Sequence, residues 1–168
     1  MFEHLHTPEE IFSFKLGSAL KMENELVDAL EELEQAAHRE EIKAALREHR
    51  DQTRQHVANV EQCFRLLGEE VDDSPCPTIE AMTKEAKATL KKTDDALADV
   101  VVLAAAGESE HHEIAVYEAL IASAEARGAN EVAELLRRNL EQEQHALDIA
   151  RNSMQKVARE GAHTGAAA

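Results

Sequence analysis

The chain has 168 residues, which is enough for one domain with a sizeable hydrophobic core. Its 18 basic and 34 acidic residues give a net charge of −16 at pH 7, which disfavours nucleic acid and anionic membranes as partners. With 6 glycines, 3 prolines and 3% aromatic residues, the composition is typical of an all-α protein. We expect a single domain over residues 1–168, folded from about 8 to 158, with 159–168 as an unstructured tail.

Three features of the sequence indicate a cytoplasmic protein. Residues 1–4 lack the basic start and apolar stretch of a signal peptide, and the longest apolar run, Val100 to Ala106, is too short to span a bilayer. Cys63 and Cys76 have the spacing of neither a disulfide framework nor a zinc site. Two free thiols in a reducing compartment are therefore expected, with a redox-linked pair as the alternative.

A capping box opens the first predicted helix, with Thr7 as N-cap, Pro8 at the first helical position and Glu10 three residues after the cap. The apolar side of this helix carries one acidic residue, Glu23. Glu25 points largely away from that side and is expected to be solvated. Glu23 is therefore the acid of this helix that needs a buried partner.

The second predicted helix runs from about residue 40 to Leu67, where Gly68 is placed to cap it. Its buried side carries His49 and His56, seven residues apart, together with Thr53. One inward histidine is most simply a hydrogen-bonded core residue. Two of them opposite an inward glutamate favour metal ligation.

The remaining elements follow a breaker over residues 69–77. A short helix over about 78–92 is expected to cross to a fourth helix, which Thr93 or Asp94 can cap and which ends at Gly128. Asn130 can cap the last helix, which we expect to end near Glu160.

Acidic residues also face the core of these last two long helices. Glu110, Glu113 and Tyr117 share the apolar side of the fourth helix, and Glu143 lies in the apolar stripe of the last one. A buried carboxylate loses several kcal/mol of hydration, so each needs a proton, a cationic partner or a metal ion.

Counting outward from the helix connections places these groups at similar heights. His49 and His56 bracket Glu23, and Glu113 is level with Glu143. Four helices that each supply a Glu or His at mid-height favour a carboxylate-bridged centre over a protonated polar layer. The ligand types suit iron or manganese, with one or two ions per chain.

At these residues the sequence resembles the ferritin-like superfamily, and more closely its YciE/YciF branch of bacterial stress proteins. The resemblance covers about residues 12–148, and its most specific part is the stretch from Glu110 to Tyr117. It implies a ferritin-like four-helix bundle of two antiparallel hairpins, with a short extra helix in the crossover. The other stretches that carry it are 23–30, 49–61, 63–68, 76–82 and 140–143.

The resemblance also implies a set of metal ligands. Glu23 matches the acid of the first helix, Glu110 and Glu113 match a Glu-x-x-Glu pair, and Glu143 matches the acid of the last helix. His56 matches the histidine of the second helix. Together with His49, these residues form the predicted metal site.

Two positions depart from the ferritin-like pattern. Thr53 stands where the second helix has an acid, and Ala146 stands where the last helix has a histidine. His49 or Gln52 can substitute for the first ligand, and no residue replaces the second. One tight and one weak metal site are a plausible result.

The leading functional hypothesis is a di-iron or di-manganese oxidoreductase of the peroxidase, catalase or ferroxidase kind, reacting with peroxide or dioxygen. Tyr117 lies one turn beyond Glu113 and is either a group that assists this chemistry or an ordinary core tyrosine. The alternatives are iron or manganese binding and storage without turnover, and a structural stress protein without metal. We expect a homodimer rather than a large cage.

Overall fold

The computed structural model describes residues 4–165, and side chains for residues 4–160, as an all-helical protein. This agrees with the all-α class that the composition predicts. No helix among the described residues is long and apolar enough to cross a membrane. In chain order the elements are α1 (Pro8–Ala36), α2 (Glu40–Leu67), α3 (Pro77–Leu90), the 3-10 helix η1 (Asp95–Leu97), α4 (Ala98–Ala126) and α5 (Asn130–Gly165).

The predicted start of α1 and the predicted end of α2 are confirmed. Glu10 N donates to Thr7 Oγ1 at 3.1 Å, and Thr7 N donates to the Glu10 carboxylate at 3.2 Å, which completes the capping box. Gly68 ends α2 with φ of 71°, a left-handed conformation that glycine adopts without a steric penalty.

The predicted start of α4 is wrong by several residues. Asp94 caps only the 3-10 turn, and the α-helix begins at Ala98. The reason lies in a tertiary contact: the buried Asp99 carboxylate accepts from His38 N at 2.7 Å and pairs with Arg39 at 3.4 Å. This contact holds the first turn of α4 against the connection between α1 and α2.

The prediction for α5 needs two corrections. Asn130 lies inside the first turn, since the Ala129 carbonyl already accepts from Ala133 N. The helix also continues to Gly165, whereas the sequence predicts an unstructured tail from residue 159. Adding residues to an existing helix costs far less than starting one, which accounts for the longer helix. The predicted tail beyond residue 165 lies outside the described residues.

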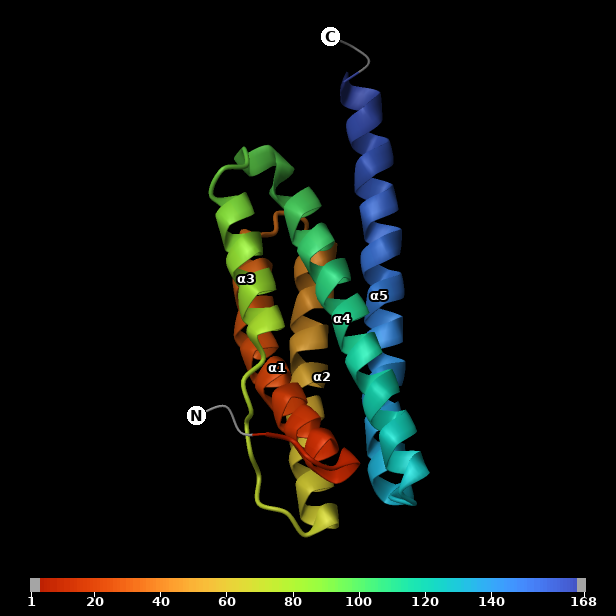
Figure 1. The fold of residues 1–168 in the computed structure, drawn as a ribbon. Coiled ribbons are helices and arrows are strands. Elements are labelled where there is room, and N and C mark those ends of the chain that lie inside the picture. Colours follow the sequence, from red (N-terminus) through yellow and green to blue (C-terminus); the bar gives the residue numbers. More distant parts are fainter. Residues whose placement is uncertain (1–3, 166–168) are drawn as a thin grey trace.

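The long helices pack in two neighbouring pairs, α1 with α2 and α4 with α5 (Figure 1). The pairs meet where α2 contacts α5 and α1 contacts α4. The short helix α3 covers α1 and α4, and the C-terminal part of α5 extends beyond the other helices at that end of the molecule (Figure 1). All four long helices therefore face one shared interior.

That interior contains two hydrophobic clusters, which buried polar residues separate on α2, α4 and α5. On α2, His49, Thr53 and His56 lie between Leu46 of one cluster and Val60 of the other. On α4, Glu110 and Glu113 likewise lie between the two clusters. The polar side chains are thus enclosed by hydrocarbon, where uncompensated charge is costly.

The chain from α2 to α3 passes very close to α1 at Gly17. A Cβ atom at residue 17 would lie 3.0 Å from Asp72 O and from Ser74 N, both backbone atoms, whereas one at Gly107 would meet nothing within 4 Å. Gly17 is therefore required by close packing, and Gly107 is not.

These two glycines give a matched prediction for stability. We expect Gly107→Ala to raise the free energy of unfolding by about 1 kcal/mol, because alanine favours the helix. We expect Gly17→Ala to lower it by about 1 kcal/mol, because the clash with the crossover outweighs the helical gain. Urea denaturation of both variants checks this, and equal shifts in the same direction would contradict the assignment of Gly17.

Candidate metal centre

All of the predicted site residues are buried, with exposed fractions of 0 to 7%. They come from α1, α2, α4 and α5, so every long helix contributes at least one side chain. The helical phase deduced from the apolar pattern is therefore confirmed for each of them. These residues are Glu23, His49, His56, Glu110, Glu113, Tyr117 and Glu143.

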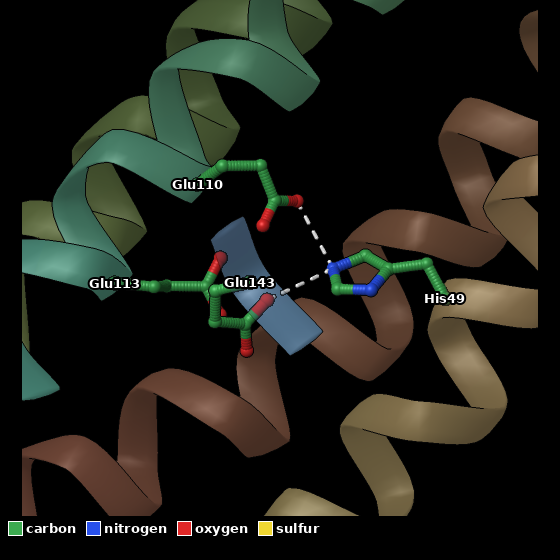
Figure 2. Close-up of side chains that lie close together, drawn as sticks. All are labelled: His49, Glu110, Glu113 and Glu143. Carbon is green, nitrogen blue, oxygen red and sulfur yellow. Dashed lines mark ion pairs between the residues drawn. The ribbon is translucent and has the colours of Figure 1, made fainter. Parts of the chain in front are cut away.

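The first group of converging side chains consists of His49, Glu110, Glu113 and Glu143 (Figure 2). One ligand atom from each lies within 4.8 Å of all the others. His49 Nε2 is 3.0 Å from Glu110 Oε1 and 3.4 Å from Glu143 Oε2. Three carboxylates and one imidazole around one point form a donor set that suits a divalent transition metal.

The second group consists of Glu23, His56 and Glu143, again with ligand atoms within 4.8 Å of one another. His56 Nδ1 lies 2.7 Å from Glu143 Oε1 and 3.5 Å from Glu23 Oε2. Glu143 belongs to both groups and presents one oxygen to each histidine. Glu143 could therefore contribute one oxygen to each of two neighbouring ions.

The two histidines predicted to bracket Glu23 in height make different contacts. Only His56 reaches Glu23, while His49 turns toward α4 and α5. Thr53 uses its hydroxyl to donate to His49 O at 3.0 Å, so it points back along its own helix. Of the two residues expected to substitute for an acid at position 53, His49 is among the converging side chains and Gln52 is not.

Two glutamines orient the imidazoles, a role that the apolar pattern of the sequence does not predict. Gln142 Oε1 lies 2.6 Å from His56 Nε2, and Gln52 Oε1 lies 3.4 Å from His49 Nδ1. Because an amide oxygen only accepts, each glutamine fixes an N–H on the ring nitrogen that faces it. The opposite nitrogens, His56 Nδ1 and His49 Nε2, are the ones turned toward the carboxylates.

Tyr117 holds Glu23 in place. Its hydroxyl donates to Glu23 Oε1 and accepts from Asn139 Nδ2 at 2.9 Å. Asn139 Oδ1 in turn accepts from Asn59 Nδ2 at 2.7 Å. Asn139 could have been anticipated, because it lies four residues before Glu143 on the same helical face, whereas no sequence pattern marks Asn59.

Removing the Tyr117 hydroxyl should therefore be costly. We expect Tyr117→Phe to lower the free energy of unfolding by about 1–3 kcal/mol, since Glu23 Oε1 loses its donor and Asn139 Nδ2 loses its best acceptor. The control is Ser123→Ala, which removes an exposed hydroxyl that bonds only to its own helix. Thermal unfolding measures both, and equal effects would contradict the role of Tyr117.

Burial dominates the electrostatics of the cluster. Desolvation, followed by repulsion from neighbouring carboxylates, raises the pKa of Glu113 well above its ordinary value. Burial also raises the pKa of Glu23 and Glu143, and raises that of Glu110 to about 7. Burial alone would lower the pKa of His56, but its contacts with Glu143 and Glu23 prevail and raise it to about 10.

Several nitrogen and oxygen atoms of the cluster have no hydrogen-bond partner among the described residues. Although His56 Nδ1 lies close to Glu143, the pair lacks hydrogen-bond geometry. Buried polar atoms normally have a partner, so such a concentration indicates a missing cation or protons. Among the described residues, the cluster atoms without a hydrogen-bond partner are Glu23 Oε2, His56 Nδ1, Glu110 Oε2 and both carboxylate oxygens of Glu113 and Glu143. These residues fit a metal ion and could hold one.

The two cysteines take no part in this cluster. Cys63 and Cys76 are both buried and both free, in agreement with the expected reduced thiols. Burial raises the pKa of the Cys63 thiol to about 12, which makes it an inert core residue.

Comparison with known sequences identifies relatives along nearly the whole chain. Residues 7–167 match the family described as "Domain of unknown function (DUF892)". Protein YciF of Escherichia coli strain K12 is 28% identical over 161 residues, which span 92% of this chain and 97% of that protein.

Solved structures give the same result at the level of the fold. YcfI from Rhodopseudomonas palustris superposes with a TM-score of 0.87 at 28% identity, over 90% of this chain and 97% of that one. The E. coli stress protein YciF gives 0.83 at 28% identity, over 90% and 99%. A protein from Xanthomonas campestris, at 22% identity over 95% and 99%, shares the fold with a TM-score of 0.74. The chain therefore belongs to the DUF892 family and is similar along nearly its whole length to the stress protein YciF.

Proposed function

We propose that the four long helices form a ferritin-like four-helix bundle of two antiparallel hairpins that binds one or two iron or manganese ions. His49, Glu110, Glu113 and Glu143 would hold one ion, and His56, Glu23 and Glu143 the other. Four buried glutamates carry a formal charge of −4, which balances two divalent cations. The observation that carries the proposal is the set of buried ligand atoms without hydrogen-bond partners.

We further propose that the centre reduces peroxide or dioxygen. Two bound ferrous or manganous ions would each give up one electron and become trivalent, and with two protons from solvent these two electrons would convert one hydrogen peroxide to two water molecules. The protein supplies the surroundings: its hydrophobic clusters restrict water, Tyr117 holds Glu23, and Gln142 keeps the Nδ1 of His56 available. A role in the bacterial stress response is proposed by similarity to YciF, which is described as a stress protein.

Elemental analysis followed by a peroxide assay tests both parts. Protein purified without a metal-affinity tag should contain between one and two equivalents of iron or manganese per chain. Metal-loaded protein should consume hydrogen peroxide faster than metal-free protein. Equal rates would overturn the proposed reaction, and failure to take up ferrous or manganous ions anaerobically would overturn the metal centre.

A second candidate function is metal binding without turnover, that is, sequestration of iron or manganese in a cytoplasmic homodimer. Complete burial of all four glutamates favours retention of an ion over rapid exchange. A third is a structural role, the provisional description given to YcfI. Binding without peroxide consumption would select the second, and thermal unfolding that is independent of metal would select the third. Sedimentation tests the dimer.

A further inference from the structure

A small cavity leads toward the proposed centre between α2, α4 and α5. Its volume is about 40 Å³. Exposed Glu48 and His145 lie along its lining, and so do His49 and Glu110 from the buried cluster. The cavity thus connects the protein surface with the edge of the first ligand group.

Small side chains create this space. Ala106, Ala146 and Ala150 line it from α4 and α5, and Ala45 lines it from α2. Ala146 lies nearly one turn beyond Glu143, at the position where the ferritin-like pattern has a histidine. An imidazole there would occupy this volume and add a ligand, whereas alanine leaves the volume open.

A buried acidic residue with an unpartnered oxygen also lines the cavity. Glu110 is only 1% exposed, and its Oε2 has no hydrogen-bond partner among the described residues. Since a buried carboxylate oxygen normally has a partner, this atom indicates that a cation or a polar molecule completes the ligand group that the cavity reaches.

From these observations we infer that the cavity is the route by which a small, neutral molecule reaches the His49 edge of the centre, and that Ala146 keeps the route open. This inference rests on the proposed function, because it specifies the substrate that the same site admits. At about 10–15 Å³ for each water-sized molecule, the cavity accommodates about three of them.

Size and charge restrict the class of molecule. Hydrogen peroxide and dioxygen each have two heavy atoms and fit the space, whereas an organic hydroperoxide with a bulky alkyl group does not. Glu48 and Glu110 in the lining disfavour anions. The apolar walls, which include Ile42, Leu46 and Leu103, tolerate a molecule with few hydrogen bonds.

The first test uses xenon, which binds in apolar cavities and needs no metal. Crystals of the metal-free protein under xenon pressure should show xenon between α2 and α5. Ala146→Leu should abolish that xenon, since the larger side chain fills the space. The control Ala158→Leu changes an exposed alanine of the same helix and should leave xenon bound.

The second test follows access to the metal by using nitric oxide, a neutral diatomic probe. In the ferrous protein, Ala146→Leu should slow nitric oxide binding at least tenfold while the iron content stays unchanged. Hydrogen peroxide should oxidise the wild-type ferrous protein at least tenfold faster than tert-butyl hydroperoxide does. Each rate is first divided by the rate at which the same peroxide oxidises free ferrous ion.

The outcomes separate this inference from the proposed function. Wild-type protein without bound xenon, or Ala146→Leu protein that takes up nitric oxide at the wild-type rate, would overturn the route. Wild-type protein that binds xenon in this cavity but takes up no iron would instead overturn the proposed metal centre, and with it the route as a path to a metal.

Discussion

Glu113→Ala is expected to lower metal affinity by at least about tenfold, because it removes one carboxylate of the first ligand group. Glu113 is 1% exposed, and neither of its carboxylate oxygens has a hydrogen-bond partner among the described residues. Among the described residues, the Glu113 carboxylate thus has no hydrogen bond that would account for its burial without a metal ion. Elemental analysis and anaerobic titration with ferrous ion measure the loss.

Glu25→Ala is the matched control for this substitution. Glu25 also lies on a long helix, α1, but it forms a surface ion pair with Lys21 at 2.8 Å, and 34% of its side chain is exposed. Its removal should leave metal binding unchanged, while Glu23→Ala should lower it as Glu113→Ala does. Equal metal content in all three variants would show that the buried acids are not ligands.

The second large effect is a fall in the stability of the metal-free protein as the pH rises. Where a carboxyl pKa is higher in the folded than in the unfolded state, the folded state binds more protons, and stability decreases with pH. For Glu110 this window runs from the ordinary value of 4.5 to about 7, which corresponds to about 3 kcal/mol. Glu23, Glu113 and Glu143 act in the same direction.

His56 adds to this trend at higher pH. Its raised pKa stabilises the fold below the unfolded value of 6.5, and this contribution is lost as the pH rises toward about 10. Urea denaturation of the metal-free protein between pH 5 and 9 should therefore show a continuous loss of stability. Glu113→Gln should reduce the slope, because a neutral amide has no proton to lose.

Metal should reverse this pH dependence. A divalent ion needs deprotonated carboxylates and a neutral imidazole nitrogen, so binding releases protons and becomes stronger as the pH rises. The difference in melting temperature between metal-loaded and metal-free protein should consequently grow from pH 5 to pH 8. A constant difference would mean that the ions bind elsewhere, at groups whose pKa values are unperturbed.

The sequence predicts the main features of the fold because they depend on local chemistry and helical phase. The capping box at Thr7 and the left-handed Gly68 are determined by a few neighbouring residues. The burial of Glu23, Glu113 and Glu143 follows from their place within apolar stripes. An acid that interrupts such a stripe is informative, because its burial has a high energetic cost.

Other features depend on contacts that no local pattern contains. The start of α4 is set by Asp99, which reaches the distant connection at His38 and Arg39. Gln52 and Gln142 are polar residues at the edges of their helices, and only the rotamers in the folded protein show that they face His49 and His56. The requirement for Gly17 likewise depends on a crossover more than fifty residues away.

The sharing of Glu143 has a consequence for how the protein would choose its metals. One side chain presents an oxygen to His49 and the other oxygen to His56, so moving it to suit one ion changes the distance available to the next. If two ions bind as proposed, filling one position would therefore affect the other. Selectivity would then belong to the pair, because an ion of unsuitable radius in one half would weaken binding in the other half and favour two matching ions.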